Sequence, residues 1–274
     1  MRDVCYCSES KLIITGFNGY IGSQLTKFLK KEVVDEKCMI GVIEDFISEA
    51  RCVIHLGASV EPTLESLKNN LTTDIELLEV INNVKIPLIY ASGNNVYPFK
   101  SHCDGDDYSI NDCYSASKVF GEQIIEKFIE VPYMFLRIGD VFGMNQKHGN
   151  FFKNIENSIK NNLPLKLYGE GLKVRSYVYI EELCRMILFC SNNVEQYSGH
   201  RFNLCNQQNA NLKSIIEYIA LKATLPIQKF DYDFQKEIDD YRTMKFNLPS
   251  EYIFEYGTFW MAIDKYIENI KKGL

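Results

Sequence analysis

Thr15-Gly-Phe-Asn-Gly-Tyr-Ile-Gly22 is the stretch of sequence that decides the fold. Its three glycines, Gly16, Gly19 and Gly22, follow an apolar, β-branched run at 11–15 that is typical of a buried strand, and they precede a helical pattern over 20–31. In such a unit the first glycine permits a tight turn, the second lets the backbone approach a pyrophosphate, and the third lets helix and strand pack closely. Glycines alone would only indicate a loop, but in this context they predict a dinucleotide site.

The rest of the chain first continues this strand and helix alternation and then abandons it. Strands are predicted at 52–56, 87–91 and 133–138, with helices at 64–82 and 114–129. Beyond about residue 145 the pattern is α+β, with helices at 150–162, 180–192 and 211–222, a strand at 165–168, and mostly loop over 225–258.

The fold class expected from this order is α/β, a Rossmann-type doubly wound parallel sheet with a smaller α+β C-terminal substrate domain. We place the dinucleotide-binding domain at 1–145 and the smaller substrate-binding region at 146–274, and we expect 176–204 to return to the first domain.

The composition is that of an ordinary globular protein and narrows the partners. The chain has 274 residues, 46% of them apolar, and a formal net charge of −6, which does not favour nucleic acid. No apolar run reaches the roughly 20 residues that span a bilayer, and MRDVCYCSES at the amino end lacks the apolar core of a signal peptide. We therefore expect a cytoplasmic protein with no membrane partner.

The nine cysteines do not predict a metal or redox site. They are scattered, form no CxxC pair, and lie at no zinc-binding spacing from the four histidines. Cys5 and Cys7 are close in sequence, but we expect a flexible amino-terminal tail there, which is a poor place to hold a redox pair.

An acidic residue usually distinguishes NAD from NADP in such a fold. It stands at the end of the second strand, about 20 residues after the first glycine, and receives the ribose 2′-hydroxyl. Asp35 is close to that place, although its surroundings are short and charged and it can equally be a solvated turn residue. The expected cofactor is NAD, with NADP left open.

Tyr114 and Lys118, in Tyr114-Ser-Ala-Ser-Lys118, are four residues apart in a helical pattern and so share one face. A nearby cation favours the phenolate, which would lower the pKa of Tyr114 from its ordinary value of about 10 and let it exchange a proton with a hydroxyl or ketone. Such a pair also arises commonly by chance.

Taken in order, these motifs resemble the NAD-dependent epimerase/dehydratase family, the extended short-chain dehydrogenases that modify nucleotide sugars. The resemblance runs from Lys11 to about Asn206. Besides TGFNGYIG and YSASK, it includes VIHLGAS at 53–59, YASGNNVYP at 90–98, LRIGDVFG at 136–143, YGEGLKVRSYVYIEEL at 168–183 and RFNLCN at 201–206.

The resemblance implies roles for the matching positions. Tyr114 would be the acid/base, and Lys118 would bind the cofactor ribose and lower the Tyr114 pKa. Arg175 would approach the diphosphate of a nucleotide-sugar substrate, for which an arginine fork is well suited. A homodimer through the helix that bears Tyr114 is also implied. The residues implied to line the cofactor are Gly16, Asn18, Gly19, Tyr20, Ile21, Gly22, Ala58 and Ser59.

The chain departs from the family pattern at Gly93, where members carry a catalytic Ser or Thr. Asn94 and Asn95 follow, and neutral amides cannot replace the Asp-Glu pair of family dehydratases, so dehydration is disfavoured. Ser92 is adjacent, but neighbouring strand residues point to opposite faces, so we expect Ser92 to face the wrong way. We therefore expect Asn94 to assist Tyr114, and we expect the substrate to be bordered by Gly93, Asn94 and Asn95.

A second departure is Asp140, which stands where many members place a substrate-contacting Asn and where a carboxylate would repel a diphosphate. The activity expected is hydride transfer at C4 of a nucleotide sugar, by a 4-ketoreductase or a 4-epimerase, with nicotinamide as the hydride carrier. Two alternatives stay open. One is a catalytically weak, cofactor-binding regulatory or scaffold protein, which Gly93 makes credible, and the other is a reductase of a non-sugar ketone.

Overall fold

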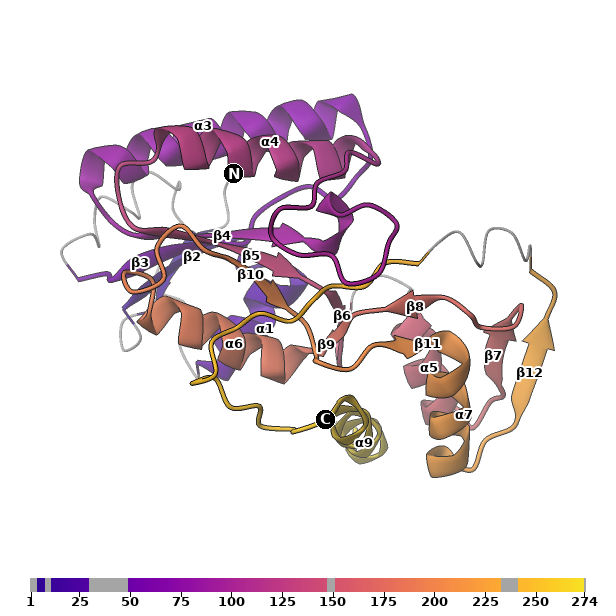
Figure 1. Ribbon diagram of the computed structural model, residues 1–274. Helices are drawn as coiled ribbons and strands as arrows, with labels where there is room; N and C mark the ends of the chain where they lie inside the picture. Colours follow the sequence, from indigo (N-terminus) through magenta and orange to yellow (C-terminus); the bar gives the residue numbers. More distant parts are fainter. Residues whose placement is uncertain (1–3, 8–10, 30–48, 147–150, 233–240, 274) are drawn as a thin grey trace. The chain divides into compact units, whose positions relative to one another are not determined.

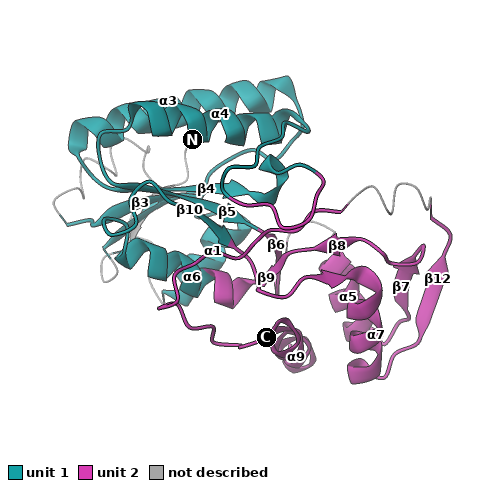
Figure 2. Ribbon diagram, viewed as in Figure 1, with its two compact units in different colours: residues 1–98, 105–138, 184–203 teal, residues 99–104, 139–183, 204–274 magenta. Residues whose placement is uncertain are grey.

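The computed structural model describes residues 4–7, 11–29, 49–146, 151–232 and 241–273. The chain forms two compact units, which are coloured separately in Figure 2. The first comprises residues 1–98, 105–138 and 184–203, and the second comprises residues 99–104, 139–183 and 204–274. The main exit from the first unit is thus at Gly139 and the return at Cys184, where the sequence suggested 145 and 176.

The first unit is built on a six-stranded sheet with the order β1-β2-β3-β4-β5-β10 (Figure 1). Strands β2 to β5 run parallel, with Thr15 opposite His55 and Gly93 opposite Ile138. The expected parallel α/β sheet is therefore confirmed. The strands are β1 (Val4–Cys7), β2 (Leu12–Thr15), β3 (Cys52–His55), β4 (Leu88–Gly93), β5 (Tyr133–Ile138) and β10 (Arg201–Leu204).

Helices cover both faces of this sheet. One face carries α3 (Leu64–Val84) and α4 (Cys113–Phe128), which pack on each other, and the other carries α1 (Tyr20–Phe28) and α6 (Ile180–Asn192) (Figure 1). Alternate strand residues meet the apolar stripes of α3 and α4, because side chains two apart in a strand share a face. The core formed there includes Ile13, Val53, Leu77, Ile81, Leu88, Tyr90, Ile125 and Phe135.

Strand β1 was not expected. It pairs antiparallel with β2, with Val4 opposite Thr15 and Cys7 opposite Leu12. Cys5 and Cys7 are buried, because this pairing turns both thiols to one covered face. The prediction of a flexible tail is wrong for these four residues, and Asp35 lies outside the described residues.

In the part of the chain that the structure describes, the second unit is α+β, with three short strand pairs. These are β6 (Asp140–Phe142) with β9 (Tyr177–Tyr179), β8 (Val174–Arg175) with β11 (Ala210–Asn211), and β7 (Leu165–Tyr168) with β12 (Ile227–Phe230). The helices that belong wholly to this unit are α5 (Phe151–Lys160), α7 (Leu212–Ala223) and α9 (Phe259–Lys272). Phe142 centres the core: its ring stacks on Phe152, with centroids 4.5 Å apart, and meets Tyr179, Phe259 and Tyr266.

Strand β12 is an exception within 225–258, where the sequence predicted mostly loop. It pairs in parallel with β7, although Ile227, Gln228 and Lys229 are exposed and give no buried-strand pattern. Among the described helices, none combines the length and apolar character that crossing a membrane requires.

Candidate functional site

The glycine turn between β2 and α1 uses its three glycines in different ways. Gly16 has a φ of 71°, and a Cβ there would lie 2.6 Å from the Gly57 backbone. A Cβ at Gly22 would overlap the backbone of Gly16 and Phe17, so this glycine lets α1 pack on the turn. At Gly19 a Cβ would meet only the Gly16 carbonyl oxygen, at 3.1 Å, among the described atoms. A Cβ at Gly19 would therefore be crowded at one backbone atom, less severely than at Gly16 or Gly22, and a ligand that approaches the backbone is a second reason for glycine there.

Helix α1 begins directly after Gly19, and no side chain caps its amino end. The first N–H groups of a helix and the positive end of its dipole favour an anion. Asn18, Tyr20 and Ile21 belong to this turn and first helical residues, as the sequence predicted. The residues present therefore fit the pyrophosphate of a dinucleotide.

The loop after β3 carries Ala58 and Ser59, both half-buried. The Ser59 amide donates to Asn70 Oδ1 at 2.9 Å, and the Ser59 carbonyl accepts from Asn70 Nδ2 at 2.9 Å. Because Asn70 belongs to α3, that helix fixes the loop beside which a cofactor is expected.

Tyr114 lies in the first turn of α4, whose start is fixed by two side chains. Asp112 and Ser115 form a reciprocal capping box, with Asp112 Oδ1 accepting from the Ser115 amide at 2.6 Å. Asn111 Nδ2 donates to the carbonyls of Asn95 and Tyr97 at 3.0 and 3.1 Å. The end of β4 and the start of α4 are thereby joined.

Lys118 is 2% exposed, and its ammonium is directed at the sheet. Its Nζ lies 3.4 Å from the Tyr90 hydroxyl and 4.5 Å from the centroid of that ring. The Tyr90 hydroxyl in turn donates to Asp74 Oδ2 at 2.8 Å. Burial lowers the pKa of Lys118, while the carboxylates of Asp74 and Glu122 oppose this shift.

The pKa of Tyr114 moves against expectation. Burial, followed by the charges of Asp112 and Asp74, raises it to about 12. This direction is opposite to the lowering predicted from Lys118, whose ammonium lies against the Tyr90 hydroxyl. Tyr114 therefore holds its proton at neutral pH.

The end of β4 explains how Gly93 is accommodated. Asn94 and Asn95 start a 3₁₀ turn (Asn94–Val96), and a Cβ at Gly93 would lie 2.9 Å from Asn95 Oδ1. Alternation places Ser92 on the face of Tyr90, which α4 covers, so the expectation that Ser92 faces the wrong way is contradicted. The Ser92 hydroxyl is buried and has no hydrogen-bond partner among the described residues.

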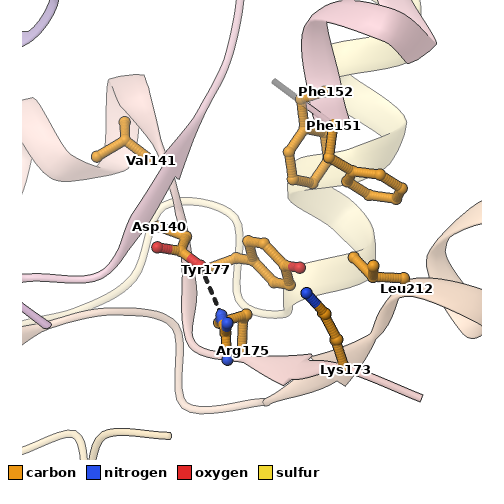
Figure 3. A pocket seen from close by; sticks show the side chains of 8 residues that line it. All are labelled: Asp140, Val141, Phe151, Phe152, Lys173, Arg175, Tyr177 and Leu212. Carbon is orange, nitrogen blue, oxygen red and sulfur yellow. Dashed lines mark ion pairs between the residues drawn. The ribbon is translucent and has the colours of Figure 1, made fainter. Parts of the chain in front are cut away.

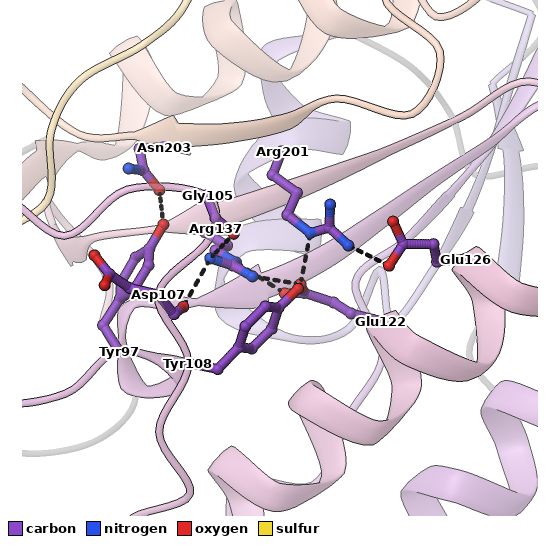
Figure 4. Close-up of polar contacts among 9 residues, drawn as sticks. All are labelled: Tyr97, Gly105, Asp107, Tyr108, Glu122, Glu126, Arg137, Arg201 and Asn203. Carbon is purple, nitrogen blue, oxygen red and sulfur yellow. Dashed lines mark hydrogen bonds and ion pairs between the residues drawn. The ribbon is translucent and has the colours of Figure 1, made fainter.

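A buried ion network fixes the second half of α4 through Glu122 (Figure 4). Arg137 binds Glu122 with two hydrogen bonds of 3.1 and 2.7 Å, and both side chains are fully buried. Arg137 Nη1 also donates to the carbonyls of Gly105 and Asp107 at 3.1 and 3.3 Å. The network thus joins α4, β5 and the loop at 105–108.

The second unit contains a cavity of about 370 Å³, and two positively charged side chains are part of its lining. Lys173 and Arg175 line it, and Arg175 Nε lies 3.5 Å from Asp140 Oδ2 (Figure 3). Asp140 therefore faces the same cavity as Arg175 and does not point away. The remaining lining residues are Val141, Phe151, Phe152, Tyr177 and Leu212. Cationic and aromatic side chains together can hold a phosphate and a planar base.

The expected site residues are distributed over both units. Apart from Asp35, those expected for cofactor and catalysis lie in the first unit, and Arg175 lies in the second. The sequence analysis missed Lys173, although its spacing of two from Arg175 was a signal, and it missed Asp74, for which no local signal exists. Across the described ranges, no cluster of His, Cys, Asp and Glu is suited to a metal ion.

Comparison with known proteins identifies the family of this chain. Residues 12–205 match the NAD dependent epimerase/dehydratase family. A dTDP-D-glucose 4,6-dehydratase of Dictyostelium discoideum is 25% identical over 179 residues, which are 57% of this chain and 41% of that protein. The uncharacterized UDP-glucose epimerase YtcB of Bacillus subtilis (strain 168) is 23% identical over 269 residues, with 78% of this chain and 84% of the relative covered.

A solved structure shares the fold. The dTDP-glucose 4,6-dehydratase of Bacillus anthracis str. Ames in complex with NAD superposes with a TM-score of 0.77 at 16% identity, covering 95% of this chain and 96% of the other. The family match extends over most of the chain and includes both the glycine turn and the Tyr114–Lys118 pair. This chain belongs to the NAD dependent epimerase/dehydratase family.

Proposed function

We propose that this protein is an NAD-dependent enzyme that transfers hydride at C4 of a nucleotide sugar, as a 4-ketoreductase or a 4-epimerase. The observation that carries the proposal is the glycine turn at 16–22, which ends at the amino terminus of α1, where no side chain caps the helix, in the same unit as Tyr114 and Lys118. Family membership supplies the dinucleotide, and the named relatives are a dTDP-sugar dehydratase and a UDP-glucose epimerase.

In the proposed site, the backbone of 16–22 holds the pyrophosphate, and the nicotinamide supplies hydride transfer when bound. Tyr114 exchanges the proton at its phenol oxygen. A phenol that holds its proton can donate it to a sugar ketone, a step that both the reductase and the epimerase require.

The cavity of the second unit is the proposed site for the nucleotide. Lys173 and Arg175 would bind the diphosphate, and Phe151 and Tyr177 offer apolar surface to a base. A homodimer through α4 belongs to the same proposal and is supported by Phe120 and Phe128, which are 39% and 61% exposed on that helix. The expected cytoplasmic location also stays part of the proposal.

A cofactor-binding protein of weak activity is the second candidate, and Gly93 favours it. The Asn95 amide occupies the space where a serine side chain would begin, and Asn94 was the expected substitute for the missing hydroxyl. Ser92 is a further source of a hydroxyl, because it lies on the α4 face without a partner in the described chain.

The cofactor site is tested by Gly19→Val, with Gly105→Val as the matched control. The added side chain should block pyrophosphate, whereas a Cβ at Gly105 has room, with its nearest neighbour, Arg201 Cβ, at 3.6 Å. Thermal stabilisation by NAD should disappear for Gly19→Val alone, since only ligand bound to the folded state raises the melting temperature. Unchanged stabilisation would place the dinucleotide elsewhere.

Catalysis is tested by Tyr114→Phe with a panel of UDP-, GDP-, CDP- and dTDP-linked sugars. Turnover should fall by roughly 10² to 10⁴, because the proton-transferring hydroxyl is lost, while NAD binding stays. Asn94→Ala and Ser92→Ala then show which side chain replaces the family hydroxyl, since single-turnover hydride transfer should slow for only one of them. Near-normal turnover by Tyr114→Phe would remove Tyr114 from the mechanism, and no turnover by the parent chain would favour the second candidate.

A further inference from the structure

A cluster of four buried polar side chains lies behind the first turns of α4 and has no role in the mechanism above except through Lys118. Asp74 and Lys118 are each 2% exposed, and His55 and Tyr90 are fully buried. They come from four different elements: β3 (His55), α3 (Asp74), β4 (Tyr90) and α4 (Lys118).

The cluster is continuous from Lys118 to the residue before the glycine turn. Lys118 Nζ donates to the Tyr90 hydroxyl at 3.4 Å, and that hydroxyl donates to Asp74 Oδ2 at 2.8 Å. The second oxygen of Asp74 lies 3.2 Å from His55 Nε2, and His55 Nδ1 lies 2.8 Å from Thr15 Oγ1. The His55 and Tyr90 rings stack with centroids 5.5 Å apart.

Charge balance shows which groups matter to Lys118. Burial lowers the pKa of His55, so the ring is neutral at neutral pH. The tautomer with its proton on Nε2 directs that proton at Asp74 Oδ1, 3.2 Å away, and leaves Nδ1 to accept from the Thr15 hydroxyl. Glu122, the other nearby carboxylate, is bound by Arg137 of β5 with two hydrogen bonds. Asp74 is thus the buried negative charge left to balance Lys118, with Tyr90 and the uncharged Tyr114 as the remaining titratable neighbours.

The helices approach closely at this point, which shows that the cluster is built in and not incidental. A Cβ at Gly121 would overlap both the Tyr90 hydroxyl and Asp74 Oδ2. Glycine at 121 therefore allows α4 to come near enough for Lys118, one turn earlier, to reach the Tyr90 hydroxyl. A lone buried charge would be costly, so Asp74 and Lys118 stabilise one another through this hydroxyl.

We propose that Asp74, acting through the Tyr90 hydroxyl, is a positioning residue that keeps Lys118 charged beside Tyr114. An ammonium has three donors, so one N–H can go to Tyr90 while the others serve a ribose. The inference rests on the proposed function, because Lys118 is there assigned to the cofactor. Asp74 then sets the pH above which Lys118 loses its charge and its hold on the cofactor.

The direct test is the titration of Lys118 in the full chain. Lysines labelled with ¹³C at Cε are followed by NMR from pH 6 to 12, and Lys118→Met assigns the signal. Asp74→Asn removes the charge but keeps the shape, and Tyr90→Phe removes only the bridging hydroxyl. Glu156→Gln is the matched control, because Glu156 is also buried and paired with lysines, on α5.

The expected order of effects is specific. An opposite charge at short range is typically worth about one to three pH units, so the Lys118 midpoint should fall by an amount of that order in Asp74→Asn. It should fall less in Tyr90→Phe and stay in place in Glu156→Gln. A merely structural role would lower the melting temperature of Asp74→Asn and Glu156→Gln alike without moving the Lys118 midpoint, and that result would overturn the proposal.

NAD binding measured by calorimetry over the same pH range separates the two proposals. If both are right, NAD affinity declines at lower pH in Asp74→Asn than in the parent chain. If the Lys118 midpoint shifts but the parent chain binds no NAD, the proposed function fails while the counter-ion role of Asp74 stands. If NAD binds and the pH at which affinity declines is the same in both proteins although the Lys118 midpoint has shifted, Lys118 does not hold the cofactor, and the proposal that Asp74 controls cofactor binding is overturned.

Discussion

Arg137 and Arg175 are both paired with a carboxylate, but the two pairs stand in opposite surroundings. The side chains of Arg137 and Glu122 are both 0% exposed, whereas those of Arg175 and Asp140 are 19% and 40% exposed. Arg137 directs its donors at protein acceptors, and Arg175 lines a cavity. A fully buried arginine such as Arg137 holds secondary-structure elements together, whereas a partly exposed arginine beside a cavity, such as Arg175, can bind a charged ligand.

The largest effect expected from this comparison is on folding. Arg137→Met removes both short hydrogen bonds to the buried Glu122. Among the described residues, this carboxylate then keeps only the longer contact with Arg201 and the Tyr108 hydroxyl, so the free energy of unfolding should fall by about 3–5 kcal/mol. Arg175→Met should cost about 1 kcal/mol or less, because a partly exposed pair contributes little. Urea unfolding measures both, and equal losses would erase the distinction between the two pairs.

The next effect is on ligand binding and has the opposite order. Arg175→Met should weaken binding of UDP or dTDP by about 1.5–3 kcal/mol, or roughly ten- to a hundredfold, since a charge-assisted contact with phosphate is lost. Calorimetry with the free nucleotide diphosphates is the measurement, and Lys222→Met, an exposed cation of α7 that pairs with Asp264, is the control. Undiminished binding by Arg175→Met would exclude the cavity as the nucleotide site.

The smallest effect concerns Asp140. In Asp140→Asn the amide keeps the shape while Arg175 loses its anionic partner, so nucleoside diphosphates should bind several-fold more tightly at low salt. The gain should shrink as salt is added, because exposed charges are screened. Weaker binding in Asp140→Asn would show instead that the carboxylate accepts a hydrogen bond from the ligand.

The local patterns predicted the fold well where the residues that decide it are neighbours in sequence. The glycine turn, the parallel strands and the helix of Tyr114 are of this kind. Strand β12 was not predicted because its residues are exposed and it pairs with β7, about 60 residues earlier in the sequence. Neither segment contains a sequence pattern that indicates its pairing partner. Strand β1 was not predicted because Val4-Cys-Tyr-Cys7 lacks the adjacent branched apolar residues that mark β2 and β3.

In the site, spacing pointed to Tyr114 and Lys118, and the family resemblance pointed to Arg175, but neither predicted their electrostatics. The pKa of Tyr114 is raised first by burial, then by Asp112 and then by Asp74, and both the burial and the approach of Asp74, 40 positions away in sequence, arise only when α3 packs on α4. The face of Ser92 was misjudged because the sequence does not say which side of β4 the helix α4 covers. Such features arise from tertiary packing and need the structure.

The antiparallel pairing of β1 has a practical consequence for anyone who prepares this protein. Val4 lies opposite Thr15, the residue directly before the glycine turn. A purification tag attached ahead of Val4 would therefore be joined to the sheet close to the proposed dinucleotide site. A tag placed after α9 would instead start in the second unit. Binding assays with NAD are therefore best made on carboxyl-terminally tagged material, with tag removal as a check.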